Sequence, residues 1–365
     1  GGGGGGGGVL PLPAGIGTVA VVGPLADAPR DQLGTWVMDG RRENTRTPLA
    51  ALREFLGEDR VRYAPGMPYS RYGKADGFAE AVEAARGADV VLFFGGEEAS
   101  LSGEAKSRAQ IDLPGVQEAL IAALAETGKP LVLVVMAGRP LTIGEQVERA
   151  DAVLYAWHPG TMGGPALVDL LFGAESPSGR LPVTFPKFVG QIPIYLAQKS
   201  TGRPAPEEVR LIDDLELEAE QHSLGYTSYW LDAGTGPLFP FGYGLSYTTF
   251  AYDNLRLSAE TMAPDGEIEV SVDLTNTGGV EAEEVVQLYV RDLVGSFTRP
   301  VRQLKGFRRV RLAPGETRTV AFTLRGADLA FHNPRMELVT EPGAFHVWVG
   351  GDSTAELRAE FRVTE

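Results

Sequence analysis

The segment GEEASLSGEAKSR, residues 96–108, places several carboxylates among small residues directly after an apolar run. The run VVLFF has the composition of a buried strand, and the Gly, Ser and Ala that follow are typical of a loop. Glu97, Glu98 and Glu104 are therefore candidates for general acid or base chemistry, which needs a carboxyl group whose pKa suits the working pH. Glycoside hydrolysis is one such reaction, since it uses two carboxyl groups flanking the scissile bond. The alternative is a solvated turn whose side chains contact only water.

Motifs for other chemistries are missing from the sequence. It contains four histidines that lie far apart and fit no zinc-binding spacing: His158, His222, His332 and His346. There is no Cys, which excludes a disulfide and a cysteine nucleophile. The GxSxG elbow and the GxxxxGK[ST] phosphate loop are also absent, and the GIG triplet precedes a strand instead of following one. These absences disfavour a serine hydrolase, an NTPase and a dinucleotide enzyme, and we expect neither a metal nor a cofactor.

Strand and helix patterns alternate from about residue 18 to residue 174. Apolar runs such as TVAVVG, DVVLFFGG and LVLVVMAG are separated by amphipathic stretches such as TPLAALREFLG and GFAEAVEAARGA. Continuous apolar strands that alternate with helices predict an α/β sandwich, a mainly parallel sheet with helices on both faces. Ligands bind beyond the carboxyl ends of the strands in such sheets. The segment 96–108 follows DVVLFF at that edge, where sites are usually built.

The pattern changes towards the C-terminus. Between residues 176 and 250, Pro, Gly and aromatic residues accumulate, as in GPLFPFGYGLSYTTF, which indicates irregular chain packed across a surface. From about Asn254, alternating runs such as EIEVSVDLTN, EEVVQLYVRD and TRTVAFTLRG are separated by turns and predict an all-β sandwich. The expected organisation is a polyglycine linker or placeholder at 1–8, an α/β domain at 9–229, an aromatic linker at 230–253 and the all-β domain at 254–365.

Charge and composition restrict the partners. Lys and Arg number 33 against 48 Asp and Glu, and the resulting net charge of −15 repels nucleic acid and anionic membrane surfaces. A hydrophobic content of 43% is enough to fill two cores. No apolar run approaches the roughly 20 residues that span a bilayer, and no signal peptide is recognisable in this chain. We therefore expect a globular protein with a neutral ligand, without nucleic acid and without a membrane span.

A series of ordered motifs carries a family resemblance. It includes AVVGPLADAPRDQLGTW, WHPGTMGGPALVDLLFGAESPSGRLPVTFP, PLFPFGYGLSYTTF and VVQLYVRD. Together these motifs resemble the C-terminal half of family 3 glycoside hydrolases, in particular bacterial β-glucosidases of the periplasmic type, over residues 18–365. The resemblance implies an α/β sandwich followed by a fibronectin type III-like domain, and a periplasmic or secreted location. It also implies an N-terminal (β/α)8 barrel, which this chain lacks.

The resemblance implies roles for residues of the segment 96–108. The family pattern Glu-Ala-x-Ser-Arg falls on Glu104, Ala105, Ser107 and Arg108. Glu104 is therefore the expected catalytic acid/base, on a loop that reaches over the barrel. Glu97, Glu98 and Arg108 are expected to support the loop, with Arg108 anchoring it through a carboxylate.

Trp36, in LGTWVMDG, is the expected substrate-binding residue. It lies in a loop after the first strand, where family members often place an aromatic on the aglycone side of the pocket. Packing in a core is the alternative for this side chain.

The expected function is the acid/base half of a retaining, exo-acting β-glucosidase that acts on β-glucosides or oligosaccharides. Its partner is the N-terminal barrel, which carries the nucleophile Asp, so the chain alone is expected to be inactive. A β-xylosidase of the same family is one alternative, because sugar preference resides mainly in the barrel. A non-catalytic carbohydrate-binding or structural module is another, although a scaffold would not need Glu104 on this loop.

Overall fold

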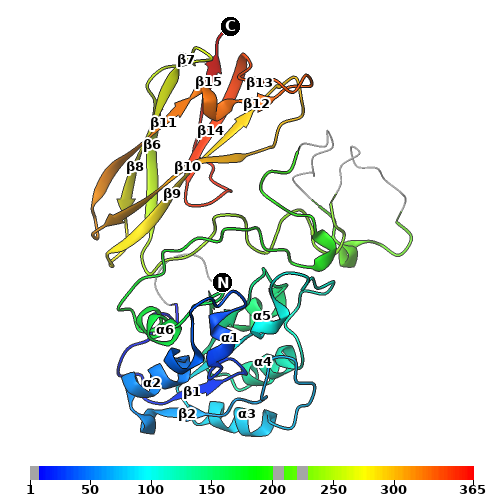
Figure 1. Cartoon of the computed structure of the whole chain (residues 1–365), viewed down its shortest axis with the longest axis vertical. Helices are drawn as coiled ribbons and strands as arrows, with labels where there is room; N and C mark the ends of the chain where they lie inside the picture. The colour runs from blue at the N-terminus through cyan, green and yellow to red at the C-terminus, as the bar shows by residue number, and fades with distance from the viewer. Residues whose placement is uncertain (1–7, 200–208, 220–228) are drawn as a thin grey trace. The chain divides into compact units, whose positions relative to one another are not determined.

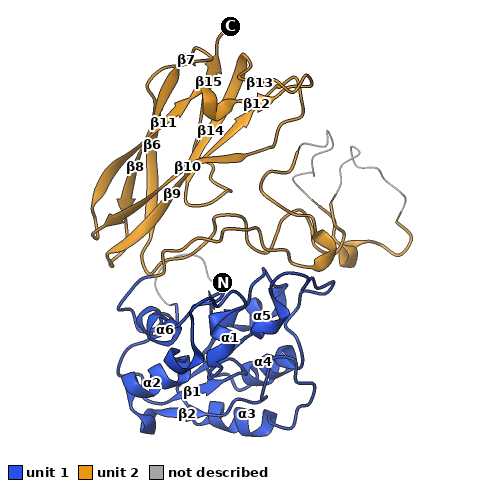
Figure 2. Ribbon diagram, viewed as in Figure 1, with its two compact units in different colours: residues 1–176 blue, residues 177–365 orange. Residues whose placement is uncertain are grey.

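The computed structural model (Figure 1) describes residues 8–199, 209–219 and 229–365 of the 365-residue chain. The chain divides into two compact units, residues 1–176 and 177–365 (Figure 2). Of the polyglycine start at 1–8, only Gly8 belongs to the described residues, and His222 lies outside them. Within the described ranges, no helix has the length and apolar character needed to cross a membrane.

The first unit is built on a parallel sheet of five strands, as predicted. The strands are β1 (Val19–Val22), β2 (Val61–Tyr63), β3 (Val90–Gly96), β4 (Leu131–Met136) and β5 (Ala152–Tyr155). They lie in the order β2-β1-β3-β4-β5, and every pairing is parallel. Strands β1, β3 and β4 are buried along their whole length, which explains why they appear in the sequence as continuous apolar runs.

Helices cover both faces of this sheet (Figure 1). Helix α2 (Pro48–Leu56) packs against α6 (Gly163–Leu171), while α4 (Gln117–Ala125) packs against α3 (Phe78–Arg86) and α5 (Gly144–Arg149). Alternate strand residues such as Val19, Val21 and Leu92 share one core with α2 and α6. Because successive strand side chains point to opposite faces, the intervening residues face the second helical layer.

Local sequence signals set the ends of these helices. At the start of α2, the side chain of Thr47 accepts a hydrogen bond from the backbone N–H of Ala50 at 3.3 Å, and Pro48 occupies the first turn, where its missing N–H is not needed. Gly57 ends the helix with a φ of 89°. One further short helix and six 3-10 turns are described: α1 (Pro29–Leu33), η1 (Arg42–Asn44), η2 (Glu58–Arg60), η3 (Ala99–Leu101), η4 (Val189–Gln191), η5 (Ile212–Asp214) and η6 (Gly326–Leu329).

The second unit contains the predicted β-sandwich. One sheet has the strand order β10-β9-β14-β15-β7 and the other β11-β8-β6, with a separate β12-β13 pair. Their apolar faces form one core, in which Val272 of β8 and Leu288 of β9 are fully buried. The strands are β6 (Phe250–Leu257), β7 (Thr261–Met262), β8 (Glu267–Asn276), β9 (Ala282–Asp292), β10 (Gln303–Leu312), β11 (Thr317–Arg325), β12 (Phe331–His332), β13 (Leu338–Val339), β14 (Gly343–Gly350) and β15 (Arg358–Val363).

The segment before β6 contains little regular structure, as its Pro and aromatic content predicts. The ring of Phe239 lies 5.9 Å from that of the buried Phe185 and stacks on Tyr243 at 5.3 Å. Arg180 forms an ion pair with the buried Glu284 of β9. The ring contacts hold the segment together, and the ion pair joins it to β9 within the second unit.

Candidate functional site

The loops that follow β1 and β3 are hydrogen-bonded to each other at the carboxyl edge of the parallel sheet. Thr35, after β1, donates through Oγ1 to the backbone carbonyls of Ala99 (3.0 Å) and Ser102 (2.7 Å), after β3. Asp31, in α1, accepts a hydrogen bond from the backbone N–H of Ala99 at 2.9 Å. Because parallel strands end at one edge, loops that are distant in sequence meet there. The loop that carries Trp36 and the loop that carries Glu104 are thus joined by hydrogen bonds.

The β3 loop has a fixed starting point at Gly96. This residue has a φ of +132°, and a Cβ atom added to it would lie 1.9 Å from the carbonyl oxygen of Met136 on β4. The buried side chain of Gln117 accepts from the N–H of Gly96 and donates to its C=O, both at 2.8 Å. Only glycine fits this position without moving the backbone, so the loop leaves the sheet in a defined direction.

Glu97, the residue after Gly96, is the centre of a buried ion-pair network. Its Oε1 accepts from Nε of Arg139 at 3.1 Å, its Oε2 accepts from Nη1 of Arg108 at 2.9 Å, and its side chain has no exposed surface. Arg108 also donates to the backbone carbonyl of Asp112 at 2.9 Å and to its carboxylate at 3.2 Å. A buried carboxylate requires such compensation. Both oxygen atoms of Glu97 are therefore engaged within the protein.

Glu98 is also engaged, by two residues that follow β2. It forms an ion pair with Arg71, and its Oε1 accepts a hydrogen bond from the hydroxyl of Ser70 at 3.3 Å. The same hydroxyl accepts from the backbone N–H of Glu98 at 3.1 Å. The loop is thus connected to the segment after β2 as well as to those after β1 and β4.

Glu104 is exposed at the tip of the loop. It occupies a turn in which the N–H of Lys106 donates to the carbonyl of Gly103 at 3.2 Å. Gly103 has a φ of +113°, Ala105 has a φ of +61°, and a Cβ on Gly103 would lie 2.5 Å from Cγ2 of Thr35. Among the residues that the structure describes, none forms a hydrogen bond or ion pair with the Glu104 carboxyl group. It differs in this respect from Glu97 and Glu98.

Trp36 is 71% exposed, so its indole does not pack in the core of the first unit. It directly follows Thr35, whose hydroxyl holds the β3 loop. The side chain is therefore presented from a backbone that is fixed relative to the loop of Glu104.

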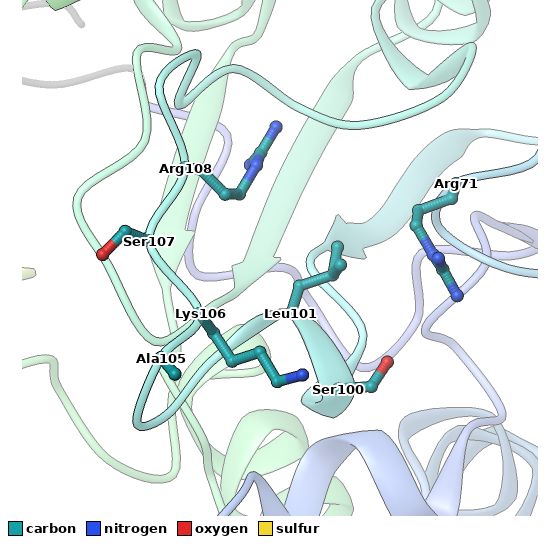
Figure 3. Close-up of a pocket in the computed structure, with 7 residues that line it drawn as sticks. All are labelled: Arg71, Ser100, Leu101, Ala105, Lys106, Ser107 and Arg108. Carbon is teal, nitrogen blue, oxygen red and sulfur yellow. The ribbon is translucent and has the colours of Figure 1, made fainter.

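A cavity of about 380 Å³ opens beside the β3 loop (Figure 3). Arg71 and Arg108 lie on different sides of it, and the Lys106 side chain extends toward Ser100 (Figure 3). The two arginines are paired with Glu98 and Glu97, which offsets their charge. The lining residues are Arg71, Ser100, Leu101, Ala105, Lys106, Ser107 and Arg108. Glu104 is not one of them, so this cavity and the exposed carboxyl group are separate features of the loop.

Sequence analysis did not single out Arg139 or assign a site role to His158. Arg139 follows β4, and its Nη2 donates to the backbone carbonyls of Leu101 and of Lys106, the latter at 2.8 Å. Its signal in the sequence is a charged residue directly after the apolar run LVLVVMAG, at the edge where loops gather.

The ring of His158, after β5, is half-buried and lies against two glycines. A Cβ on Gly34 would lie 2.7 Å from the Cγ of His158, and one on Gly138 would lie 2.9 Å from its Nε2. Burial lowers the pKa of His158, and the charges of Glu97 and Asp31 partly oppose this effect. The lowered pKa favours the neutral form of the imidazole at pH 7. In the described parts of the chain, no group of three or more His, Cys, Asp or Glu side chains is arranged to hold a metal ion.

Two family models match this chain. Residues 6–247 match the Glycosyl hydrolase family 3 C-terminal domain, and residues 284–353 match the Fibronectin type III-like domain. The chain therefore belongs to family 3 of the glycosyl hydrolases, in agreement with the resemblance seen in its motifs.

Individual relatives show what share of their own length this chain matches. The chain is 43% identical to the Periplasmic beta-glucosidase of Salmonella typhimurium, over 95% of the chain and 46% of that protein. It is 37% identical to a Beta-xylosidase of Formosa agariphila, over 93% and 45%. The crystal structure of β-glucosidase from Listeria innocua in complex with isofagomine matches with a TM-score of 0.87 and 35% identity, over 97% and 47%. The chain thus spans about half the length of the relatives it matches.

Proposed function

We propose that this chain is the C-terminal part of a retaining, exo-acting β-glucosidase and that Glu104 is its catalytic acid/base. One observation carries the assignment. Of the three glutamates in segment 96–108, Glu97 and Glu98 are ion-paired, whereas the Glu104 carboxyl group has no partner among the described residues. A group that exchanges protons with a substrate and with water needs an accessible oxygen atom and a backbone that holds this atom within hydrogen-bond reach of the reacting group. Glu104 meets both requirements.

The proposed mechanism divides the catalytic groups between two parts of the enzyme. The nucleophile Asp belongs to an N-terminal (β/α)8 barrel, and the half-length coverage of the relatives supports the existence of such a missing part. Glu104 protonates the glycosidic oxygen while the nucleophile attacks the anomeric carbon, and then removes a proton from the water that hydrolyses the covalent intermediate. The chain alone is therefore inactive. The name of the Salmonella relative supports a periplasmic location.

Trp36 is proposed to bind the aglycone side of the substrate. Its exposed indole and the hydrogen bonds of Thr35 to the β3 loop support this role, because they hold a flat apolar surface at the same edge of the sheet as Glu104. A sugar ring can stack on such a surface.

Replacing Glu104 by Gln in the full-length enzyme tests the proposed role. A poor leaving group such as a sugar needs protonation, so hydrolysis of a disaccharide should lose most of its rate. An activated aryl group departs without help, so the glycosyl-enzyme intermediate should accumulate with that substrate. Azide needs no deprotonation and should partly restore turnover, with a β-glycosyl azide as product. Near-normal disaccharide hydrolysis by Glu104→Gln would exclude Glu104 as the acid/base.

A β-xylosidase remains the second candidate, because the Formosa relative with that name matches 93% of the chain. Measuring kcat/KM of the full-length enzyme for an aryl β-glucoside and the corresponding β-xyloside distinguishes the two. A higher value for the xyloside would replace the glucosidase assignment. Activity on neither substrate, with the barrel present, would favour a non-catalytic module.

A further inference from the structure

Arg139 closes the neck of the loop that carries Glu104. Its Nη2 donates to the backbone carbonyl of Leu101, three residues before Glu104, and to that of Lys106, two residues after it, at 2.8 Å. One guanidinium group thus joins the two ends of the segment 101–106, and Glu104 lies in the turn between them.

The guanidinium group is itself held in place. Its Nε donates to Oε1 of the buried Glu97 at 3.1 Å, and the Arg139 side chain is only 18% exposed. The hydroxyl of Tyr155, on β5, donates to the backbone carbonyl of Arg139 and accepts from the N–H of Leu141 at 3.2 Å. The donors that close the loop are therefore fixed relative to the sheet.

We propose that Arg139 and Glu97 are positioning residues for the acid/base, an inference that rests on the proposed role of Glu104. The turn contains Ala105 at a φ of +61°, a conformation that a non-glycine residue keeps only when its surroundings impose it. The two carbonyl contacts of Arg139 impose it from the neck of the loop. Without them, the turn relaxes and the carboxyl group leaves the position from which it protonates the glycosidic oxygen.

The chemistry of arginine suits this task better than that of lysine. Arg139 donates to three acceptors at once, one through Nε and two through Nη2, and the planar guanidinium group fixes the angles between these donors. A lysine ammonium is a compact point charge at the end of a flexible stem, so it can neutralise Glu97 without holding both carbonyls. Arg139→Lys therefore separates the charge of Arg139 from its geometry.

The test compares Arg139→Lys and Arg139→Gln with Glu104→Gln in the full-length enzyme. The quantity measured is kcat/KM, for a glucose disaccharide and for dinitrophenyl β-glucoside, because it reports the first irreversible step. Misplacing a catalytic group by an ångström costs up to about 100-fold, so we expect Arg139→Gln to lose about 10- to 100-fold on the disaccharide. On the activated substrate, whose first step needs no acid, the loss should stay within about threefold. Arg139→Lys should lie between Arg139→Gln and the wild type on the disaccharide.

A matched control uses the same substitution at a surface ion pair. Arg149 on α5 pairs with the exposed Glu145 at 2.9 Å, and Arg149→Gln should change neither rate. Equal losses on both substrates, or no loss on the disaccharide, would overturn the positioning role. If Arg139→Gln does not fold, the same criteria apply to Arg139→Lys, which keeps the charge beside Glu97.

Parallel data for Glu104→Gln tell the two proposals apart. If Glu104→Gln lacks the leaving-group dependence, the proposed function fails and this inference fails with it. If Glu104→Gln shows the dependence and neither Arg139 variant does, only the positioning role is wrong.

Discussion

Glu97→Gln should destabilise the first unit far more than the same change at a surface ion pair. Glutamine keeps the shape of glutamate, but one of its terminal atoms is an NH2 donor. In the site of Glu97, that donor faces the N–H groups of either Arg108 or Arg139. The hydrogen bond to that arginine is lost, which leaves a buried donor unsatisfied. The hydrogen bond from the other arginine remains, but its acceptor is no longer charged.

The magnitude follows from these two changes. A hydrogen bond to a charged group contributes about 1.5–3 kcal/mol, and an unsatisfied buried donor costs about 1–3 kcal/mol. Arg108 and Arg139 are 19% and 18% exposed and keep their contacts with Asp112 and the loop carbonyls, which offsets part of the loss. We expect the free energy of unfolding to fall by about 3 kcal/mol. For a unit of 176 residues this corresponds to a decrease in Tm of about 6–12 °C.

Scanning calorimetry of the chain measures this shift in the transition of the first unit. Glu145→Gln is the control, because Glu145 is 66% exposed and pairs with Arg149 one helical turn away. Its effect should not exceed about 0.5 kcal/mol and should disappear at high salt. If Glu97→Gln came within about 1 kcal/mol of this control, the network around Glu97 would not stabilise the unit as we argue.

Two further predictions concern the exposed Trp36 and the half-buried His158. Trp36→Ala in the full-length enzyme should raise KM for disaccharides more than it changes hydrolysis of an aryl glucoside. It should leave Tm unchanged, because the indole is 71% exposed. Equal effects on both substrates would contradict aglycone binding. Because the pKa of His158 is lowered in the folded state, the unfolded state binds a proton at this histidine more readily. The contribution of His158 to the free energy of unfolding is therefore fully present above pH 6.5 and decreases as the pH falls from 6.5 towards the folded pKa. Below pH 6.5, the free energy of unfolding of the first unit should therefore depend less steeply on pH in His158→Gln than in the wild type. Equal slopes would show that His158 is not held as a neutral ring in the folded unit.

The sequence by itself determined the classes of structure and the family. Runs such as DVVLFFGG and LVLVVMAG predicted parallel strands because burial on both faces demands continuous apolar residues, and the structure confirms them as β3 and β4. The change to alternating runs predicted the β-sandwich for a similar reason. Because loops that follow parallel strands meet at the carboxyl edge of the sheet, the sequence also placed the segment 96–108 among those loops.

Only the tertiary structure decided how the three glutamates of that segment differ. They lie within eight positions in the same polar loop, and local sequence assigns them similar exposure. Their partners come from distant parts of the chain: Glu97 meets Arg139, 42 positions away, and the loop itself is held by Thr35, 67 positions from Ser102. Whether a carboxyl group is buried and paired or exposed and available depends on which strand ends are neighbours in the sheet. Strand order arises from packing of the whole domain, so the surroundings of Glu97, Glu98 and Glu104 emerge only when the chain is folded.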